Sequence, residues 1–270
     1  MKMQFRAPLV AVLFLVAGLL FVAWPCAGRA AELLACGGVA ARENVSLESV
    51  NERLDLILAD GRMIYFPTLE PPRATAAGPQ RPKTVAAELA SLLAGKRLDL
   101  QRVGASDRWE RIPALLFVEG EAESADEILA GAGLAMAGVG AGKCGDKVRA
   151  AEAAARADGL GLWGDPDFAV LAADAPQNLS GRGGTLALVE GRVASFGHTP
   201  PRLYLNFGGG RGGIALTIAR RNRILFERAG LSEADLLHKF IRARGVVEIG
   251  ISPQIELFHP DQIEFIEDRH

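Results

Sequence analysis

The stretch Gly95–Val118 limits the fold most, because it has the pattern of two strands joined by a short polar loop. In its first part, leucines alternate with charged residues, which is typical of a half-buried strand. Its last part, Ile112–Val118, is a continuous apolar run that predicts a more deeply buried strand. The loop between them crowds charge around Trp109. It is either a solvated hairpin tip with a local ion pair between Asp107 and Arg111, or it presents an arginine to a phosphate group.

The segment Asp107–Arg111 reads DRWER and is similar to the D-[KR]-Y-G-R motif of the staphylococcal-nuclease (thermonuclease) family, with Trp in place of Tyr and Glu in place of Gly. The same order of features follows: a strand, the VEG turn Val118–Gly120, a helix ending in GAGLA, and the sequence GLWGDP at Gly161–Pro166. The resemblance spans roughly Val45–Phe168. It implies a small barrel of the oligonucleotide/oligosaccharide-binding (OB) type with flanking helices, and a phosphodiesterase in which Arg111 is a catalytic residue that contacts the phosphate.

The active-site half of the family pattern is incomplete in this sequence. Tyr65 and Phe66 stand where the family carries an arginine, and Arg73 replaces the carboxylate that assists the attacking water. Each lost group is typically worth about 10²–10⁴-fold in rate, so the resemblance implies an impaired enzyme. Glu52 and Glu70 fall where the family places metal-binding aspartates. We therefore expect no cofactor, unless the site is active with Ca²⁺ held by these two carboxylates.

The N-terminus, residues 1–31, has the pattern of an export signal. Lys2 and Arg6 flank the start of the apolar run Ala7–Trp24, and small residues follow it. The run is also long enough to span a membrane, and Leu33–Cys36 resembles a lipoprotein motif. A cleaved signal, a retained anchor and a lipoprotein are thus the alternatives. In each case we expect an exported protein, periplasmic or secreted, with membrane attachment only through an uncleaved N-terminal segment.

Two of the three cysteines remain once the signal is removed, because Cys26 lies within it. An even pair in an oxidising compartment favours a disulfide. We therefore predict a bond between Cys36 and Cys144, which ties the mature N-terminus to the loop between two helices. In the chain-entropy account, closing a loop of roughly 100 residues contributes about 4–5 kcal/mol. The alternative is two unpaired thiols.

The 270 residues allow one large or two ordinary domains, and 30 Lys and Arg face 32 Asp and Glu, so any basic surface must be local. We expect a mainly β, α+β protein with two tandem OB-type barrels: a thermonuclease-like domain at 36–168, a linker at 169–182 and an OB-like domain at 183–268. The Pro- and Gly-rich segment 73–83 is expected to be a mobile loop. Helices are expected at 84–94 and 146–158. In the second domain, strands are expected at 185–196, 202–207, 214–219, 241–249 and 254–257. Two helices are expected between the third and fourth of these strands, at 222–229 and 232–239.

The predicted second domain brings aromatic and basic side chains together in its first part. Stacking surfaces and guanidinium groups are what a single-stranded nucleic acid requires. The candidates for this contact are Arg202, Tyr204, Phe207, Arg220, Arg221 and Arg223. Alternatively, Phe207 belongs to the core, the arginines only solvate a surface, and the domain has a structural or protein-contact role.

The residues and the resemblance together predict an exported thermonuclease-like protein with impaired catalysis. Its expected partner is single-stranded nucleic acid or an envelope protein. Two alternatives remain open: an active metal-dependent phosphodiesterase with a rearranged site, and a structural protein of the cell envelope.

Overall fold

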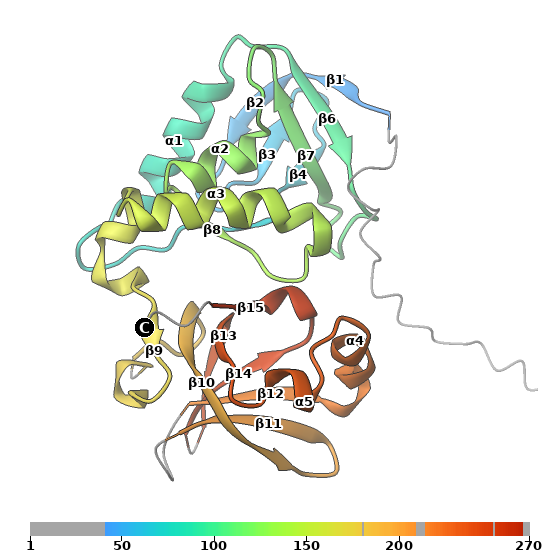
Figure 1. The fold of residues 1–270 in the computed structure, drawn as a ribbon. Coiled ribbons are helices and arrows are strands. Elements are labelled where there is room, and N and C mark those ends of the chain that lie inside the picture. The colour runs from blue at the N-terminus through green and yellow to red at the C-terminus, as the bar shows by residue number, and fades with distance from the viewer. Residues whose placement is uncertain (1–40, 180, 209–213, 251, 267–270) are drawn as a thin grey trace, which may run out of the picture. The chain divides into compact units, whose positions relative to one another are not determined.

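The computed structural model describes residues 41–266 except 180, 209–213 and 251, and these residues belong to one compact unit (Figure 1). The described chain is mixed α+β and consists mainly of strands. The predicted export signal and Cys36 lie outside the described residues. Within the described part, no helix combines the length and the apolar character needed to cross a membrane.

A closed five-stranded β-barrel, here called the N-terminal barrel, forms the first part of the fold. Its strand segments are β1 (Glu43–Val45), β2 (Leu47–Val50), β3 (Leu56–Leu58), β4 (Met63–Tyr65), β6 (Leu98–Arg102) and β7 (Ile112–Val118). β1 and β2 act as one bent strand, because Ser46 alone separates them; β1 pairs with β6, and β2 pairs with β3. The ring continues from β3 through β4 and β7 to β6, with β4 and β7 parallel. A ring closed in this way has no open edge.

Helices and a small sheet accompany this barrel. They are α1 (Arg81–Leu93), α2 (Ala125–Gly131), α3 (Asp146–Ala157), β5 (Leu69–Glu70) and β8 (Met136–Ala137). Alternating leucines of the strands, such as Leu56, Leu98 and Leu116, form the core together with the apolar face of α1. The helix α1 begins earlier than predicted, because Pro82 lies in its first turn, where a missing backbone N–H has little cost. β5 and β8 pair with each other in antiparallel orientation.

A seven-stranded sheet, here called the C-terminal sheet, follows. Its strands and the helices beside them are β9 (Leu171–Ala172), β10 (Leu186–His198), β11 (Arg202–Phe207), β12 (Ala215–Ala219), α4 (Arg223–Arg228), α5 (Glu233–Leu236), β13 (Phe240–Ile249), β14 (Pro253–Leu257) and β15 (Ile263–Phe265). Five strands form a second ring of pairings: β10 pairs with β11 and β13, β12 pairs with β11, and β14 pairs with β13 and, in parallel, with β12. The order of three strands, two helices and two strands matches the predicted order. Both rings are compatible with OB-like barrels.

The segment expected to be a linker has regular structure in part. β9 pairs in parallel with β10, and a 3₁₀ turn occupies Pro176–Leu179. Leu171, Ala173 and Leu179 are buried in the core of the C-terminal sheet. The composition of this segment is that of a linker, but its few apolar residues are buried against the C-terminal sheet. The other 3₁₀ turns of the described residues are Gly142–Gly145, Gly161–Gly164, Pro166–Phe168, Arg220–Asn222 and Pro260–Gln262.

The segment 73–83, which we expected to be mobile, is held to residues far along the chain. The Arg73 guanidinium donates to the Asp167 carbonyl oxygen at 2.6 Å. The Asp165 carboxylate accepts from the Thr75 hydroxyl at 2.6 Å and from the Arg81 guanidinium at 2.8 Å. These contacts are polar and long-range, so composition alone does not reveal them.

Candidate functional site

The loop between β6 and β7 is a tight polar turn built around Asp107. One oxygen of this carboxylate accepts hydrogen bonds from the backbone N–H groups of Trp109 and Arg111, at 2.9 and 3.0 Å. Glu110 takes a positive φ of 63°, a conformation that favours glycine, and it stands at the glycine position of the thermonuclease motif. The turn therefore has a defined backbone that sets the direction of the Arg111 side chain.

The Arg111 guanidinium lies between two carboxylates. Its Nε donates to Asp107 Oδ2 at 2.9 Å, and its Nη1 donates to Asp55 Oδ1 at 2.9 Å. Asp55 is buried, and its other oxygen accepts from the Asn51 side-chain amide at 3.0 Å. Burial alone lowers the pKa of Arg111, but the hydrogen bond and charge of Asp107, together with Asp55, outweigh it and raise that pKa. The predicted Asp107–Arg111 ion pair is confirmed, and Asp55 adds a second anion that we did not anticipate.

Aromatic rings approach the same guanidinium. The Arg111 Cζ atom is 4.8 Å from the centre of the Tyr65 ring and 5.3 Å from that of Trp109. The Arg108 Cζ atom lies 3.9 Å from the Trp109 ring. Trp109 itself is 60% exposed. The tip of the hairpin therefore presents a large aromatic surface beside cations, an arrangement with attractive cation–π interactions.

A pocket of about 150 Å³ opens beside Arg111. It is lined by Arg53, Leu54, Asp55, Tyr65, Phe66, Pro67, Leu69, Pro71 and Arg111. The lining is mixed: aliphatic, prolyl and aromatic groups are combined with the Asp55–Arg111 ion pair. This volume suits one side chain rather than a whole small-molecule ligand, since typical ligand pockets measure about 300–1,000 Å³.

The two predicted metal ligands do not assemble a calcium site with the residues that the structure describes. Glu52 and Glu70 are both exposed, and neither is part of the pocket lining. The nearby carboxylate of Asp55 already binds Arg111 and Asn51. Calcium takes 6–8 oxygen ligands, and among residues 41–266 as described no group of three or more His, Cys, Asp and Glu side chains gathers in this way. The oxygen atoms of this group of residues do not fit a calcium ion.

Arg73, which the sequence resemblance places at the position of a catalytic carboxylate, takes part in a structural contact. Besides donating to the Asp167 carbonyl, its Cζ atom lies 4.6 Å from the Phe168 ring. Arg73 is also absent from the pocket lining. Its guanidinium therefore anchors the segment after β5 to residues that follow α3, which accounts for an arginine at this position.

The predicted nucleic-acid contacts of the C-terminal sheet differ in exposure, and three of the arginines lie near acidic partners. Arg202 and Arg221 both approach Glu256, at 3.7 and 3.8 Å, and Arg223 pairs with Glu233 at 3.0 Å. Phe207 is buried in the core, so the alternative core assignment holds and this ring offers no stacking surface. Three candidates stay accessible: Tyr204 is half-buried, and Arg220 and Arg221 are exposed.

Sequence reasoning missed Asp55 as the partner of Arg111. The signal was present, because Asp55 is an acid between two leucines that are buried. Asn51 positions it locally: the Asn51 side-chain oxygen accepts from the backbone N–H groups of Arg53 and Asp55, at 2.8 and 3.0 Å. Such a turn is typical of asparagine, but the pairing with Arg111 depends on closure of the barrel.

Cys144 is buried and disulfide-bonded. Its predicted partner, Cys36, lies outside the described residues, so the Cys36–Cys144 pairing stays a prediction. Comparison of the chain with models of known protein families finds no match, and neither does comparison with curated proteins.

Proposed function

We propose that this protein is an exported binding protein, built on two tandem OB-type barrels, that holds a polypeptide partner without hydrolysing phosphodiesters. We further propose that its first barrel has the thermonuclease fold. The observation that carries the proposal is the double neutralisation of Arg111 beneath the exposed Trp109. A guanidinium bound by two carboxylates is a poor phosphate ligand, while an exposed tryptophan beside a pocket is a good protein contact.

Strand order supports the two barrels. In the N-terminal barrel, the bent strand pairs with the second and fourth strands, and the third strand pairs in parallel with the fifth. The ring of β10–β14 repeats this order, with β10 as the first strand and the β12–β14 pair in parallel. A helical insert lies between the third and fourth strands in both cases. A shared order of this kind agrees with the OB-type topology.

The chemistry of the site argues against hydrolysis. Phosphoryl-transfer enzymes depend on positioned cations that stabilise the charge of the transition state. Arg111 already has three contacts of 2.9 Å to carboxylate oxygens. By the resemblance, Arg73 stands in the place of the carboxylate, and Tyr65 or Phe66 in the place of a second arginine. The active-phosphodiesterase alternative would require all of these contacts to rearrange.

Charge at the hairpin favours a polypeptide over a polyanion. Around the pocket and the tip, acids and arginines balance: Asp55, Asp107 and Glu110 against Arg53, Arg108 and Arg111. Nucleic-acid affinity comes mainly from the neutralisation of phosphates, which such a surface does not provide. Trp, Tyr and Arg are the residues that dominate binding energy at protein interfaces, and Trp109, Tyr65 and Arg108 provide all three.

The proposal is tested with two probes on the purified mature protein. Peptides selected from a random displayed library on the immobilised protein should lose at least about tenfold in affinity for Trp109→Ala, since truncating such a residue typically costs 2 kcal/mol or more. Phe265→Ala, which removes an exposed ring of the C-terminal sheet, should leave that affinity unchanged. Labelled single-stranded DNA, with and without Ca²⁺, should be neither cut nor retained.

Three results would overturn the proposal. Calcium-dependent DNA cleavage that disappears in Arg111→Ala would establish the phosphodiesterase. DNA retention that weakens steeply with salt would establish nucleic acid as the ligand. Peptides that bind Trp109→Ala as well as the unaltered protein would remove the hairpin from the binding surface.

A further inference from the structure

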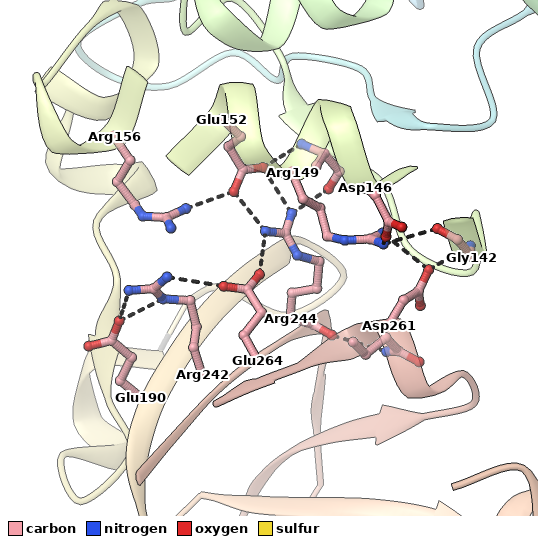
Figure 2. A network of polar contacts seen from close by, with 12 residues as sticks. Gly142, Asp146, Arg149, Glu152, Arg156, Glu190, Arg242, Arg244, Asp261 and Glu264 are labelled. Carbon is pink, nitrogen blue, oxygen red and sulfur yellow. Dashed lines mark hydrogen bonds and ion pairs between the residues drawn. The ribbon is translucent and has the colours of Figure 1, made fainter. Parts of the chain in front are cut away.

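The side chain of Arg244, on the C-terminal sheet, contacts α3 and β8, which accompany the N-terminal barrel. It lies on β13 and is only 2% exposed, and its partner Glu152, on α3, is fully buried. Arg244 Nη1 donates to Glu152 Oε2 at 2.9 Å, and Nη2 donates to Glu152 Oε1 at 2.7 Å. Figure 2 shows the two side chains pointing toward each other, with Arg156 and Glu264 beside them. This fork-to-fork geometry is the strongest arrangement of an arginine and a carboxylate.

The same pair also holds the main chain of Ala137 in β8. Arg244 Nη1 donates to the Ala137 carbonyl oxygen at 2.6 Å, and the Ala137 N–H donates to Glu152 Oε2 at 2.5 Å. The two side chains thus bind both polar groups of this residue, as a neighbouring strand would. Without Arg244, a buried carbonyl and a buried carboxylate would each lose a donor, which is costly in a region excluded from water.

β8 in turn supports the wall of the candidate pocket. Its pairing with β5 places Ala137 opposite Leu69 and Met136 opposite Glu70. The Gly138 N–H extends this contact by donating to the Thr68 carbonyl oxygen at 2.7 Å. Leu69 lines the pocket, as do residues on both sides of β5. Arg244 is therefore connected to the pocket through Ala137 of β8 and then through the strand β5.

We infer that Arg244 is a positioning residue for the pocket beside Arg111: by binding Ala137 it fixes β8, and through β8 it fixes the β5 wall. The C-terminal sheet thereby controls the shape of a site that none of its own residues lines. This inference rests on the proposed function in one respect, namely that the pocket is a binding site. The placement of β5 by Arg244 is testable without any ligand.

Arg242 provides a matched control. It lies two positions before Arg244 on β13 and also makes ion pairs, with Glu190 and with Glu264 at 3.1 Å. These partners belong to the C-terminal sheet, and no hydrogen bond or ion pair from Arg242 to β8 is found among the described residues. Replacing Arg242 therefore removes partly buried charge pairs from the same strand without removing a contact to Ala137.

The test compares Arg244→Met, Arg244→Lys and Arg242→Met in the full mature chain by hydrogen exchange with mass spectrometry. We expect segments 66–71 and 136–138 to exchange at least about tenfold faster in Arg244→Met, since the loss of charged hydrogen bonds promotes local opening. The β6–β7 segments should exchange as in the unaltered protein, and Arg242→Met should leave 66–71 unchanged. Arg244→Lys keeps the charge but loses the planar fork, so it should give a smaller acceleration in the same two segments.

Unchanged exchange at 66–71 in both Arg244 variants would overturn the inference. Equal acceleration of every segment would also overturn it, because that pattern reports a general loss of stability rather than release of one wall. If Arg244→Met does not fold, Arg244→Lys decides by the same criteria. The exchange result stands whether or not library peptides bind, so failure of the proposed function and failure of this inference are distinguished.

Discussion

At the scale of the residue, Glu110 is held in a backbone conformation that suits glycine. Its φ of 63° is in the left-handed region, which costs a residue with a Cβ roughly 1–2 kcal/mol. We predict that Glu110→Gly raises the free energy of unfolding by about 1 kcal/mol, the remainder being offset by the greater freedom of glycine in the unfolded chain. Urea denaturation followed by tryptophan fluorescence measures the change. Glu123→Gly, at an exposed position with ordinary φ, should give no gain, and an equal gain in both variants would contradict the explanation.

Asp107 makes the hairpin sensitive to acid. Burial acts to raise the pKa of its carboxyl, but hydrogen bonds from the Arg111 side chain and from the backbone of Arg111 and Trp109 lower it below the ordinary value. A lowered folded-state pKa contributes stability above the unfolded-state pKa of about 3.9, and this contribution is lost as pH falls through the folded-state value. We predict that the stability of the unaltered protein falls more steeply below about pH 5 than that of Asp107→Asn. Urea midpoints measured from pH 7 downward test this, and parallel curves would rule it out.

Of the two carboxylates that bind Arg111, only one could be predicted from the sequence. Asp107 and Arg111 are four positions apart in one loop, so their pairing was predictable from local chemistry. Asp55 meets Arg111 only because β3, β4 and β7 are neighbours in the closed barrel. The sequence marks Asp55 as an unusual acid among leucines, but it carries no local signal of the partner. Long-range polar pairs of this kind require the tertiary fold.

At the scale of the element, the segment 73–83 depends on one buried carboxylate. Asp165 accepts from Thr75, from Arg81 and from the backbone N–H of Asp167. We predict that Asp165→Ala lowers the free energy of unfolding by about 2–4 kcal/mol, because it leaves these donors without their acceptor. Released from its anchor, the segment should become a site of tryptic cleavage after Arg73 or Lys83, detected by mass spectrometry.

The neighbouring acid is the control for this element. The Asp167 side chain is 45% exposed, so Asp167→Asn should change neither the stability nor the cleavage pattern appreciably. Cleavage after Arg73 at the same rate in all three proteins would show that Asp165 does not hold the segment. The element also illustrates a limit of composition: Pro and Gly favoured mobility as a local tendency, while the Asp165 carboxylate and the Asp167 carbonyl oxygen, both far along the sequence, hold the segment.

Element types and their order were more predictable than element limits. The apolar run at Ile112–Val118 is a strand with the same bounds, because it is buried along most of its length. The expected linker, in contrast, contributes Leu171 and Leu179 to a core. Isolated apolar residues in a Pro- and Gly-containing stretch have no periodicity from which burial can be inferred. Their role follows from the strand β10 beside them.

At the scale of the whole molecule, an apolar cluster adds to the polar contacts of Arg244. Met136, Leu162 and Phe168 pack with Leu186 and Leu188 of β10. A cluster that joins residues 136–170 to β10 of the C-terminal sheet predicts that the described protein unfolds in one cooperative step. The described residues contain two tryptophans: Trp109, in the loop between β6 and β7, and Trp163, which packs against this apolar cluster.

We therefore predict coincident urea transitions by tryptophan fluorescence, which follows the β6–β7 loop and the apolar cluster, and by far-UV circular dichroism, which follows the whole chain. Leu162→Ala, at a fully buried position, should lower both midpoints together and cost about 2–5 kcal/mol, the usual range for such a cavity. A mutation in a core that belonged to one region alone would shift the fluorescence transition and leave a second transition in the dichroism. Two separate midpoints in the unaltered protein would show that the apolar cluster and the Arg244–Glu152 pair do not couple the two regions.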